Sequence, residues 1–246
     1  MFGGPGFSPG AKFTHRSANP RRSYTMCPAP RPWKTAVAGN GLAASLEVFD
    51  MKRLLSFGTL LMSVAALPAM AALQSGESAP QFTAQASLAG KAFTFSLKEA
   101  LSKGPVVVYF YPSAYTGGCD IEAHTFAQDS EKFATAGATI IGVSLDSIQR
   151  LNDFSADPKY CAGKFPTASD VGGAISKSYD IDVHEGHAGL KDVRGVEIGH
   201  GFADRTTFVI SRDGKIVTVI SNVTPAEHVA KALAVVQQLQ AKSSGA

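Results

Sequence analysis

The sequence predicts an α/β domain built on a mixed central sheet with helices on both faces. Two apolar runs, at 105–111 and 138–144, have the length and continuity of strands that are covered on both sides. A segment with helical spacing of apolar residues follows each run. Near the C-terminus, Asp213-Gly214 joins two more strand-like runs, and this dipeptide is a strong hairpin signal. Alternating strands and helices that end in a hairpin indicate a sheet of mixed direction.

The first elements of this domain are short. Residues 92–97 alternate apolar and polar side chains, which predicts a strand. Residues 98–103 predict a helical turn that Gly104 ends. The buried strand at 105–111 leads to Cys119, where an amphipathic helix begins. Apolar or small residues recur along that helix at positions 119, 123, 126, 127, 133 and 134.

The remaining elements continue the alternation. They are a strand at 138–144, helices at 147–155 and 173–179, and hairpin strands at 206–211 and 215–221. The last helix opens with a capping Thr224, Pro225 in the first helical position and Glu227 to complete a capping box. A thioredoxin-like fold is the natural candidate for this order of elements.

The predicted domain spans residues 72–246, which is one domain's length, and we expect a flexible lead-in at 72–80. Residues 51–71 have the order of a secretory signal peptide, with two cations, an apolar stretch at 54–67 and a small-x-small cleavage site. Fourteen helical residues span about 21 Å, short of the roughly 30 Å hydrocarbon core, so we expect cleavage without stable membrane insertion. The pattern predicts a secreted, periplasmic protein.

Residues 1–50 are rich in Gly, Pro, Ser and Arg and have no apolar periodicity. We expect them to be disordered, or untranslated because Met51 is the more credible start. An Arg-rich organelle targeting segment is the other interpretation.

Charge is spread unevenly along the chain. Residues 1–71 hold eight of the 23 Lys and Arg but two of the 20 acids, so residues 72–246 carry a net charge of −3. No basic stripe or basic-aromatic interleaving is present, and nucleic-acid binding therefore has no electrostatic basis.

The chemistry-bearing segment is Pro112-Ser113-Ala114-Tyr115-Thr116-Gly117-Gly118-Cys119, between a buried strand and a helix. Sites form at the carboxyl ends of strands in open α/β sheets. A helix N-terminus carries unpaired N–H groups and about half a positive charge, so we expect the pKa of Cys119 to fall below its free value. Thr116 places a hydroxyl near the sulfur, and Pro112 is positioned to shield it from water.

The spacing P-x-x-x-T-x-x-C after an apolar strand resembles the signature of the peroxiredoxins, the alkyl hydroperoxide reductase C/thiol-specific antioxidant family. Pro112, Thr116 and Cys119 match it, and Arg205 matches the family's active-site arginine ahead of a strand. The resemblance covers about 76–239 and is strongest to the Q-type (bacterioferritin-comigratory-like) subgroup. Gly117 departs from the pattern, because family members often carry Pro there.

This resemblance implies a thiol-dependent peroxidase with no cofactor and no metal. Cys119 would attack hydrogen peroxide or an organic hydroperoxide and become a sulfenic acid, while Arg205 holds the developing negative charge and Thr116 aligns the O–O bond. The expected partners are the peroxide and a thioredoxin-like or other thiol reductant. The expected assembly state is a monomer or weak dimer.

The resolving cysteine is less directly indicated. Q-type members often carry it five residues after the first, where this chain has Thr125. Some place it in the region of Cys161, which would then form an intramolecular disulfide with Cys119. The alternative is an ordinary loop thiol and a one-cysteine mechanism.

Other functions lack the residues they need. A thiol–disulfide oxidoreductase on this fold needs C-x-x-C, but Glu122 and Thr116 stand at the two possible positions. A non-catalytic redox-binding module is the remaining alternative. Asp182, His184, His187 and His200 form a possible metal cluster without supporting pattern.

Overall fold

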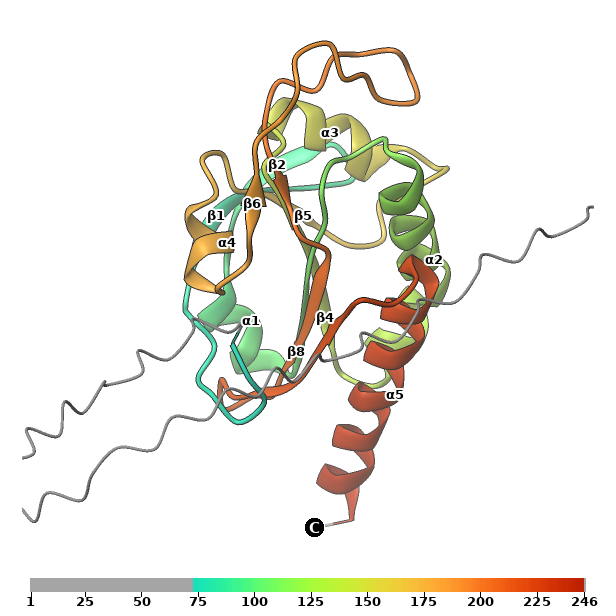
Figure 1. Ribbon diagram of the computed structural model, residues 1–246. Helices are drawn as coiled ribbons and strands as arrows, with labels where there is room; N and C mark the ends of the chain where they lie inside the picture. The colour runs from blue at the N-terminus through green and yellow to red at the C-terminus, as the bar shows by residue number, and fades with distance from the viewer. Residues whose placement is uncertain (1–72, 246) are drawn as a thin grey trace, which may run out of the picture. The chain divides into compact units, whose positions relative to one another are not determined.

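The computed structural model describes residues 73–245, which are built on a seven-stranded sheet of order β2-β1-β5-β4-β3-β8-β9 (Figure 1). The predicted segments 1–50 and 51–71 lie outside the described residues. Strands β3 (Val106–Phe110) and β4 (Thr139–Ser144) run parallel at the centre, and β8 (Thr206–Ile210) pairs antiparallel with β3. Every residue of β3 and β8 is buried, as expected for strands covered on both faces.

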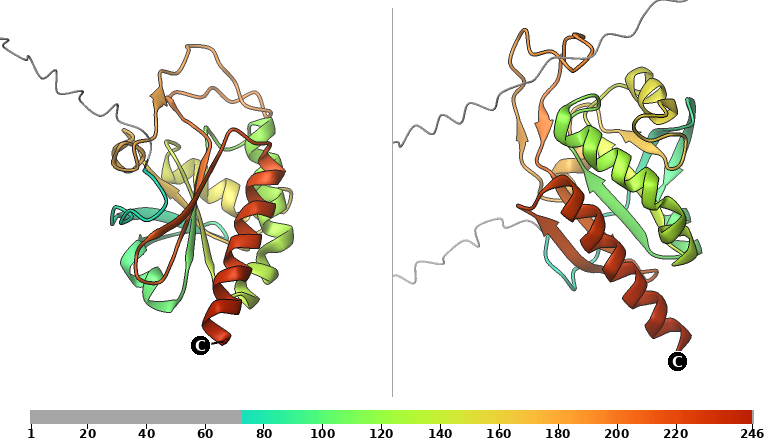
Figure 2. Two further views of the ribbon diagram at one scale, coloured as in Figure 1. Left: turned by 60° about the horizontal axis from the view of Figure 1, so that its bottom comes forward. Right: turned by 90° about the vertical axis from the view of Figure 1, so that its right-hand side faces the viewer.

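Helices cover both faces of the sheet, which confirms the predicted architecture. Alternate residues of β3 point to opposite faces, so Tyr109 and Phe110 belong to different core clusters. Three helices cover the Tyr109 face: α2 (Gly117–Thr135), α3 (Ile148–Ala156) and α5 (Pro225–Ser244). Two shorter ones, α1 (Leu97–Lys103) and α4 (Ala174–Ser178), cover the other. Figure 2 shows α2 and α5 side by side on their face.

The C-terminal part of the domain is close to the expected one. Strands β8 and β9 (Ile216–Ser221) form the predicted hairpin. Helix α5 begins with the predicted capping box, in which Thr224 and Glu227 exchange side chain–backbone hydrogen bonds. No helix within residues 73–245 is long and apolar enough to cross a membrane.

Four strands were not expected from the sequence. Strand β1 (Thr83–Leu88) pairs with β2 (Lys91–Ser96) and with β5 (Thr167–Ser169), and β6 (Val183–His184) pairs with β7 (Phe202–Ala203). Strands β1 and β5 consist largely of small or polar residues, and β6 and β7 contain only two residues each, so their patterns are weak.

The expectation of a flexible lead-in is wrong for its described part. The backbone N–H of Gly76 donates to Ile216 O, and that of Ala79 donates to Gly214 O. These hydrogen bonds fix the segment along the β8–β9 hairpin, and Ala79 is buried there.

Gly142 of β4 is what allows helix α2 to lie where it does. A Cβ at this position would lie 2.7 Å from the ring and hydroxyl of Tyr109 on the neighbouring strand. The Tyr109 ring in turn stacks on Phe126 of α2, with ring centroids 4.6 Å apart. The glycine therefore leaves the space that Tyr109 needs to support the helix that carries Cys119.

We expect Gly142→Ala to lower the free energy of unfolding by about 1–3 kcal/mol, because the buried Tyr109 ring has no room to move aside. Urea unfolding of the full chain measures the change. Gly199→Ala is the matched control, since no heavy atom lies within 4 Å of its added Cβ and its φ is not in the left-handed region. Equal losses in both variants would contradict this account of Gly142.

Candidate active site

Cys119 lies in the first turn of helix α2, just beyond the carboxyl end of β3. Thr116 is the N-cap residue of this helix, and its hydroxyl donates to Ser113 O at 2.7 Å. Pro112 is half-buried at the start of the loop. Only 2% of Cys119 is exposed, so the residue is almost completely buried.

Arg205 reaches this thiol from the neighbouring strand. The antiparallel register pairs Phe110, the last residue of β3, with Thr206, so Arg205 stands beside the start of the Cys119 loop. Its Nη2 donates to Cys119 Sγ at 3.2 Å. A Cβ on Gly118 would lie 3.2 Å from this Nη2, so Gly118 leaves room for the guanidinium. The structure thus brings Arg205, Thr116 and Cys119 together at one helix N-terminus.

Burial opposes ionisation of the thiol. It raises the pKa of Cys119 above its ordinary value, although the charge of Arg205 and hydrogen bonds from Thr116 and the backbone act to lower it. The expected fall in the pKa is therefore not met in this closed conformation, because the sulfur is almost completely removed from water.

Glu122, one turn along α2, shares the same guanidinium. Its Oε2 accepts a hydrogen bond from Arg205 Nη1, and burial raises its pKa to about 7 despite that contact. A single guanidinium therefore faces two buried acids, Glu122 and Cys119. It carries one positive charge, so it fully compensates only one of them at a time.

His228 of α5 lies beyond Glu122 and is also buried. Its Nδ1 is 2.9 Å from Thr207 Oγ1 and 3.9 Å from Glu122 Oε1, and burial lowers its pKa to about 4. The i, i+4 spacing to the buried residues Ala232 and Val236 was the signal that could have revealed this inward position.

Cys161 is a fully buried free thiol on the same face of the sheet as Cys119. Its segment packs against α2, because Lys159 O lies 3.0 Å from Nδ1 of His124 and Phe165 packs edge-on against Phe126. The two cysteines are thus in one core cluster, Cys119 on α2 and Cys161 in the loop between α3 and β5. Burial, followed by the charges of Asp157 and Asp120, raises the pKa of Cys161 well above its ordinary value.

Sequence reasoning missed a second set of charged residues behind the Cys119 loop. Buried Asp146 accepts hydrogen bonds from Ser113 Oγ at 2.9 Å and from the backbone N–H of Ala114 at 2.7 Å. Its position two residues after β4, at the edge of the sheet where β3 also ends, was the signal available in the sequence.

The possible metal cluster is not assembled. His184 Nε2 lies 2.9 Å from Asp204 Oδ1, and His200 Nε2 lies 2.8 Å from Asp146 Oδ1. Across the described part of the chain, no group of three or more His, Cys, Asp or Glu residues could hold a metal ion.

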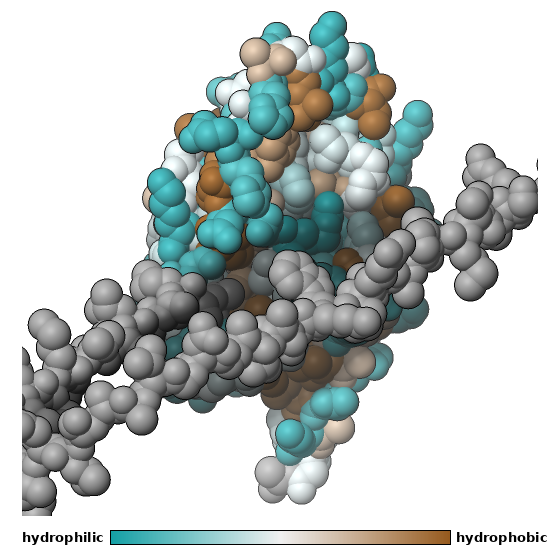
Figure 3. Space-filling model, viewed as in Figure 1, coloured by the Kyte–Doolittle hydropathy of each residue, from teal (hydrophilic) through white to brown (hydrophobic). Residues whose placement is uncertain are grey.

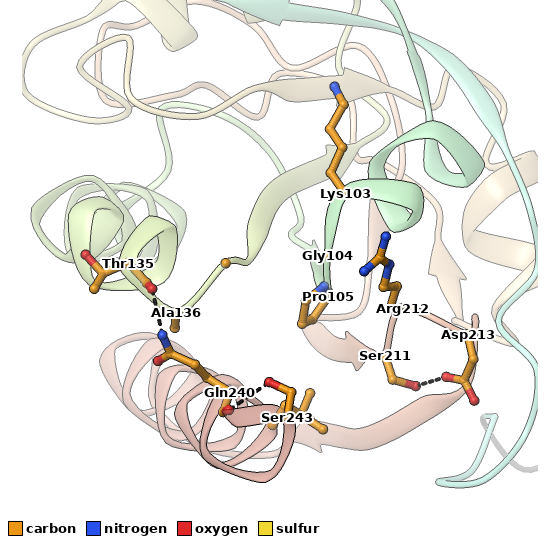
Figure 4. A pocket seen from close by; sticks show the side chains of 12 residues that line it. Lys103, Gly104, Pro105, Thr135, Ala136, Ser211, Arg212, Asp213, Gln240 and Ser243 are labelled. Atoms are coloured by element: carbon orange, nitrogen blue, oxygen red, sulfur yellow. Dashed lines mark hydrogen bonds between the residues drawn. The ribbon is translucent and has the colours of Figure 1, made fainter. Parts of the chain in front are cut away.

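One hollow of the described structure lies away from this chemistry. It has a volume of about 500 Å³ and is lined by Lys103, Pro105, Arg212 and Gln240, among others (Figure 4). Pro105 precedes β3, whereas Cys119 lies beyond the other end of that strand. No cysteine lines this hollow, so it is not the site of thiol chemistry.

Comparison with known proteins agrees with the geometry. The AhpC/TSA family model matches residues 75–219. Peroxiredoxin Bcp of Xanthomonas campestris is 33% identical over 154 residues, which cover 58% of this chain and 89% of that protein. Chloroplastic peroxiredoxin Q of Oryza sativa is 30% identical over 235 residues, which cover 89% of this chain and 93% of that protein.

This chain is also similar to a solved structure of the same family. The crystal structure of peroxidoxin BcpB from Mycobacterium tuberculosis aligns with a TM-score of 0.56 and 29% identity, over 68% of this chain and 97% of that one. These relatives favour a peroxidase over the disulfide oxidoreductase and the non-catalytic module considered above. The chain therefore belongs to the AhpC/TSA family and is a peroxiredoxin, a thiol-dependent peroxidase related to the Bcp and Q proteins.

Proposed function

We propose that Cys119 reduces hydrogen peroxide or organic hydroperoxides and that Cys161 then resolves the oxidised thiol as an intramolecular disulfide. The observation that carries the first half is the 3.2 Å hydrogen bond from Arg205 Nη2 to Cys119 Sγ at the N-terminus of α2. A cation and unpaired helix N–H groups here face both the sulfur and the oxygen that it attacks.

In the first step, the Cys119 thiolate attacks the terminal oxygen of ROOH. The S–O bond forms as the O–O bond breaks, and the leaving RO⁻ takes up a proton to become ROH. The sulfur loses two electrons and becomes a sulfenic acid, while the peroxide is reduced. Arg205 stabilises both the thiolate and the negative charge on the leaving oxygen.

In the second step, the Cys161 thiolate attacks the Cys119 sulfenic sulfur. An S–S bond forms, and hydroxide leaves and is protonated to water. The packing of the Cys161 segment against α2 supports this pairing. Because both thiols are buried, Cys119 on α2 and Cys161 in the loop after α3, we expect the Cys119 turn to open for the sulfurs to meet. A thioredoxin-like or other thiol reductant would then reduce the disulfide.

We also propose that the protein is exported. The signal-like order of residues 51–71 supports secretion to the periplasm, where an exported reductant would act on the Cys119–Cys161 disulfide. We further propose a monomer or weak dimer as the working form.

Substituting each cysteine tests the two steps separately. We expect Cys119→Ser to abolish peroxide consumption, because Cys119 is the one cysteine within residues 73–245 that is hydrogen-bonded to Arg205. We expect Cys161→Ser to consume one equivalent of peroxide and stop with one added oxygen on Cys119. Intact mass and peptide mapping of the reduced full chain after one equivalent of hydrogen peroxide give both results.

The control for this pair is Cys27→Ser, which should behave as the wild type and lose two hydrogens through a Cys119–Cys161 link. A one-oxygen product in the wild type would keep the peroxidase step and remove Cys161 from the mechanism.

Removing the cation should slow oxidation of Cys119 strongly. We expect Arg205→Met to lower the second-order rate constant with peroxide by about 10²-fold or more, since a charged donor to the reacting atoms is lost. Rapid-quench mass spectrometry measures this rate. Arg212→Met, an exposed arginine bonded to Ser102 O at the other end of the sheet, should leave it unchanged. Similar rates in the two variants would remove Arg205 from the active site.

Glu122 should tune the ionisation of Cys119. Glu122→Gln removes a negative charge that competes for Arg205, so we expect the pKa of the thiol to fall. The sign follows because a nearby carboxylate disfavours the thiolate. Iodoacetamide alkylation of Cys119 across pH should show its midpoint at lower pH than in the wild type. The variant should also lack an inflection near pH 7, where Glu122 takes up a proton.

A midpoint that instead moves to higher pH in Glu122→Gln would mean that Glu122 acts mainly by holding Arg205 in place. Glu131→Gln, an exposed acid farther along α2, is the matched control and should not move the midpoint.

A further inference from the structure

The loop before Cys119 contains a strained residue. Tyr115 has a φ of 60°, a conformation that costs free energy for a bulky side chain. Its ring is nevertheless buried, with 2% of the residue exposed. Such a conformation persists only where the surroundings hold it firmly. The contacts that hold Tyr115 therefore also hold the turn that carries Cys119.

Asp146 holds the loop from behind. Besides Ser113 and Ala114, it accepts a hydrogen bond from Ser144 Oγ at 2.8 Å and contacts His200 Nε2 at 2.8 Å. Burial alone would raise the pKa of Asp146, but the hydrogen bonds from His200 and Ala114 hold it below its usual value. The carboxylate thus stays ionised and needs a buried cation.

Arg150 of α3 is that cation, and it joins three parts of the chain. Its Nε lies 2.8 Å from Asp146 Oδ1. Its Nη2 donates to Ala114 O at 2.8 Å and to Asp192 Oδ2 at 2.8 Å. The Arg150 side chain is only 12% exposed, so these contacts are largely protected from water. Arg150 therefore links the Cys119 loop to α3 and to the segment between β6 and β7.

That segment closes over Tyr115. Asp192 accepts hydrogen bonds from the backbone N–H groups of Arg194 and Val196, which makes a tight turn. The backbone N–H of Val193 donates to Tyr115 O at 3.0 Å, and the guanidinium carbon of Arg194 lies 3.3 Å above the centre of the Tyr115 ring. Figure 1 shows the segment reaching over the end of the sheet where α2 begins.

The outer surface of this segment is mixed in character. Val193 and Val196 are exposed beside charged residues, and Figure 3 shows apolar and polar side chains interspersed at the top of the face in view. The contacts that this segment makes with Tyr115 and Arg150 lie on its inner side.

Tyr115 also touches the segment that carries Cys161. Its ring packs edge-on against Tyr160, the residue before Cys161, with centroids 5.4 Å apart. Phe154 of α3 contacts both rings. A displacement of Tyr115 would thus release the Cys119 turn and remove a packing partner from the Cys161 segment.

We propose that Arg150 is a positioning residue that, through Ala114, Asp146 and Asp192, keeps Tyr115 and the Cys119 turn in the peroxide-reducing conformation. This inference rests on the resolution of Cys119 by Cys161 proposed above. Peroxide reduction needs the closed turn, whereas disulfide formation needs the open one. Loss of Arg150 contacts therefore slows the first step and accelerates the second.

The test measures the two steps separately in full-length Arg150→Lys, which keeps the charge but cannot reach all three partners. Reduced protein is mixed with hydrogen peroxide, quenched with N-ethylmaleimide at increasing times, and analysed by intact mass and peptide mapping. We expect the peroxide-dependent rate of Cys119 oxidation to fall and the peroxide-independent rate of disulfide formation to rise. Each change should be roughly fivefold to thirtyfold, as loss of one or two polar contacts predicts.

Arg194→Met provides a second, milder variant, because Arg194 is more exposed than Arg150 and its loss removes the stacking on Tyr115. It should shift both rates in the same directions. Arg212→Met is the matched control and should change neither rate. Far-ultraviolet circular dichroism confirms that each variant is folded.

The outcomes separate this inference from the proposed function. If the wild type forms no Cys119–Cys161 disulfide, the proposed resolution fails and the inference fails with it. If the wild type forms the disulfide but folded Arg150→Lys and Arg194→Met slow both steps together, or change neither, only the inference is overturned. A purely structural role would lower both rates.

Discussion

The contact on which the site depends is the one between Arg205 and the Cys119 sulfur. A buried thiol in an apolar cluster would remain protonated and inert without a cation close by. The antiparallel register of β3 and β8 provides that cation, because it places the residue before β8 beside the residue after β3. The parallel pairing of β3 and β4 and the glycine at position 142 then set where α2 begins. The pairing of these strands therefore determines where the residues of the active site lie.

Sharing of this cation makes the ionisation of the site cooperative. Arg205 contacts both Cys119 and Glu122, and both acids lie in nearly water-free surroundings where two negative charges against one positive charge are unfavourable. Ionisation of the thiol and ionisation of the carboxyl group therefore oppose each other. His228 lies on the far side of Glu122, and its lowered pKa keeps it neutral, so it adds no second positive charge there. The thiolate is thus favoured most when Glu122 is protonated, and a simple picture of a helix-activated cysteine is incomplete.

The sequence predicts the parts of this structure that depend on local patterns. Continuous apolar runs indicated β3, β4 and β8, and the Thr224–Glu227 capping box located the start of α5. The motif from Pro112 to Cys119 and the arginine ahead of β8 indicated the reacting residues. Strand β1 escaped prediction because its small and polar residues gain their stability from pairing with β2 and β5. The Asp146–Arg150–Asp192 network escaped prediction because Asp192 lies 42 residues after Arg150 in the chain, and no short motif indicates that they are in contact. The predicted fall in the pKa of Cys119 was wrong for a related reason, because how deeply the thiol is buried depends on the whole fold.

Burial and reactivity oppose one another in this molecule, and the strained turn is where they are balanced. In the closed conformation Cys119 lies beside Arg205 and is almost completely buried. In the proposed mechanism, the same closure has to be undone before Cys119 can reach Cys161, which lies in the loop between α3 and β5 and belongs to the same core cluster. A strained Tyr115 lowers the free energy needed to open the turn, while the contacts to Ala114, Tyr115 and Asp192 raise it. The balance between these terms decides how long an oxidised Cys119 stays in the pocket. If Cys161 resolves Cys119 as proposed, this balance also decides how long the sulfenic acid is exposed to a second peroxide before the disulfide forms.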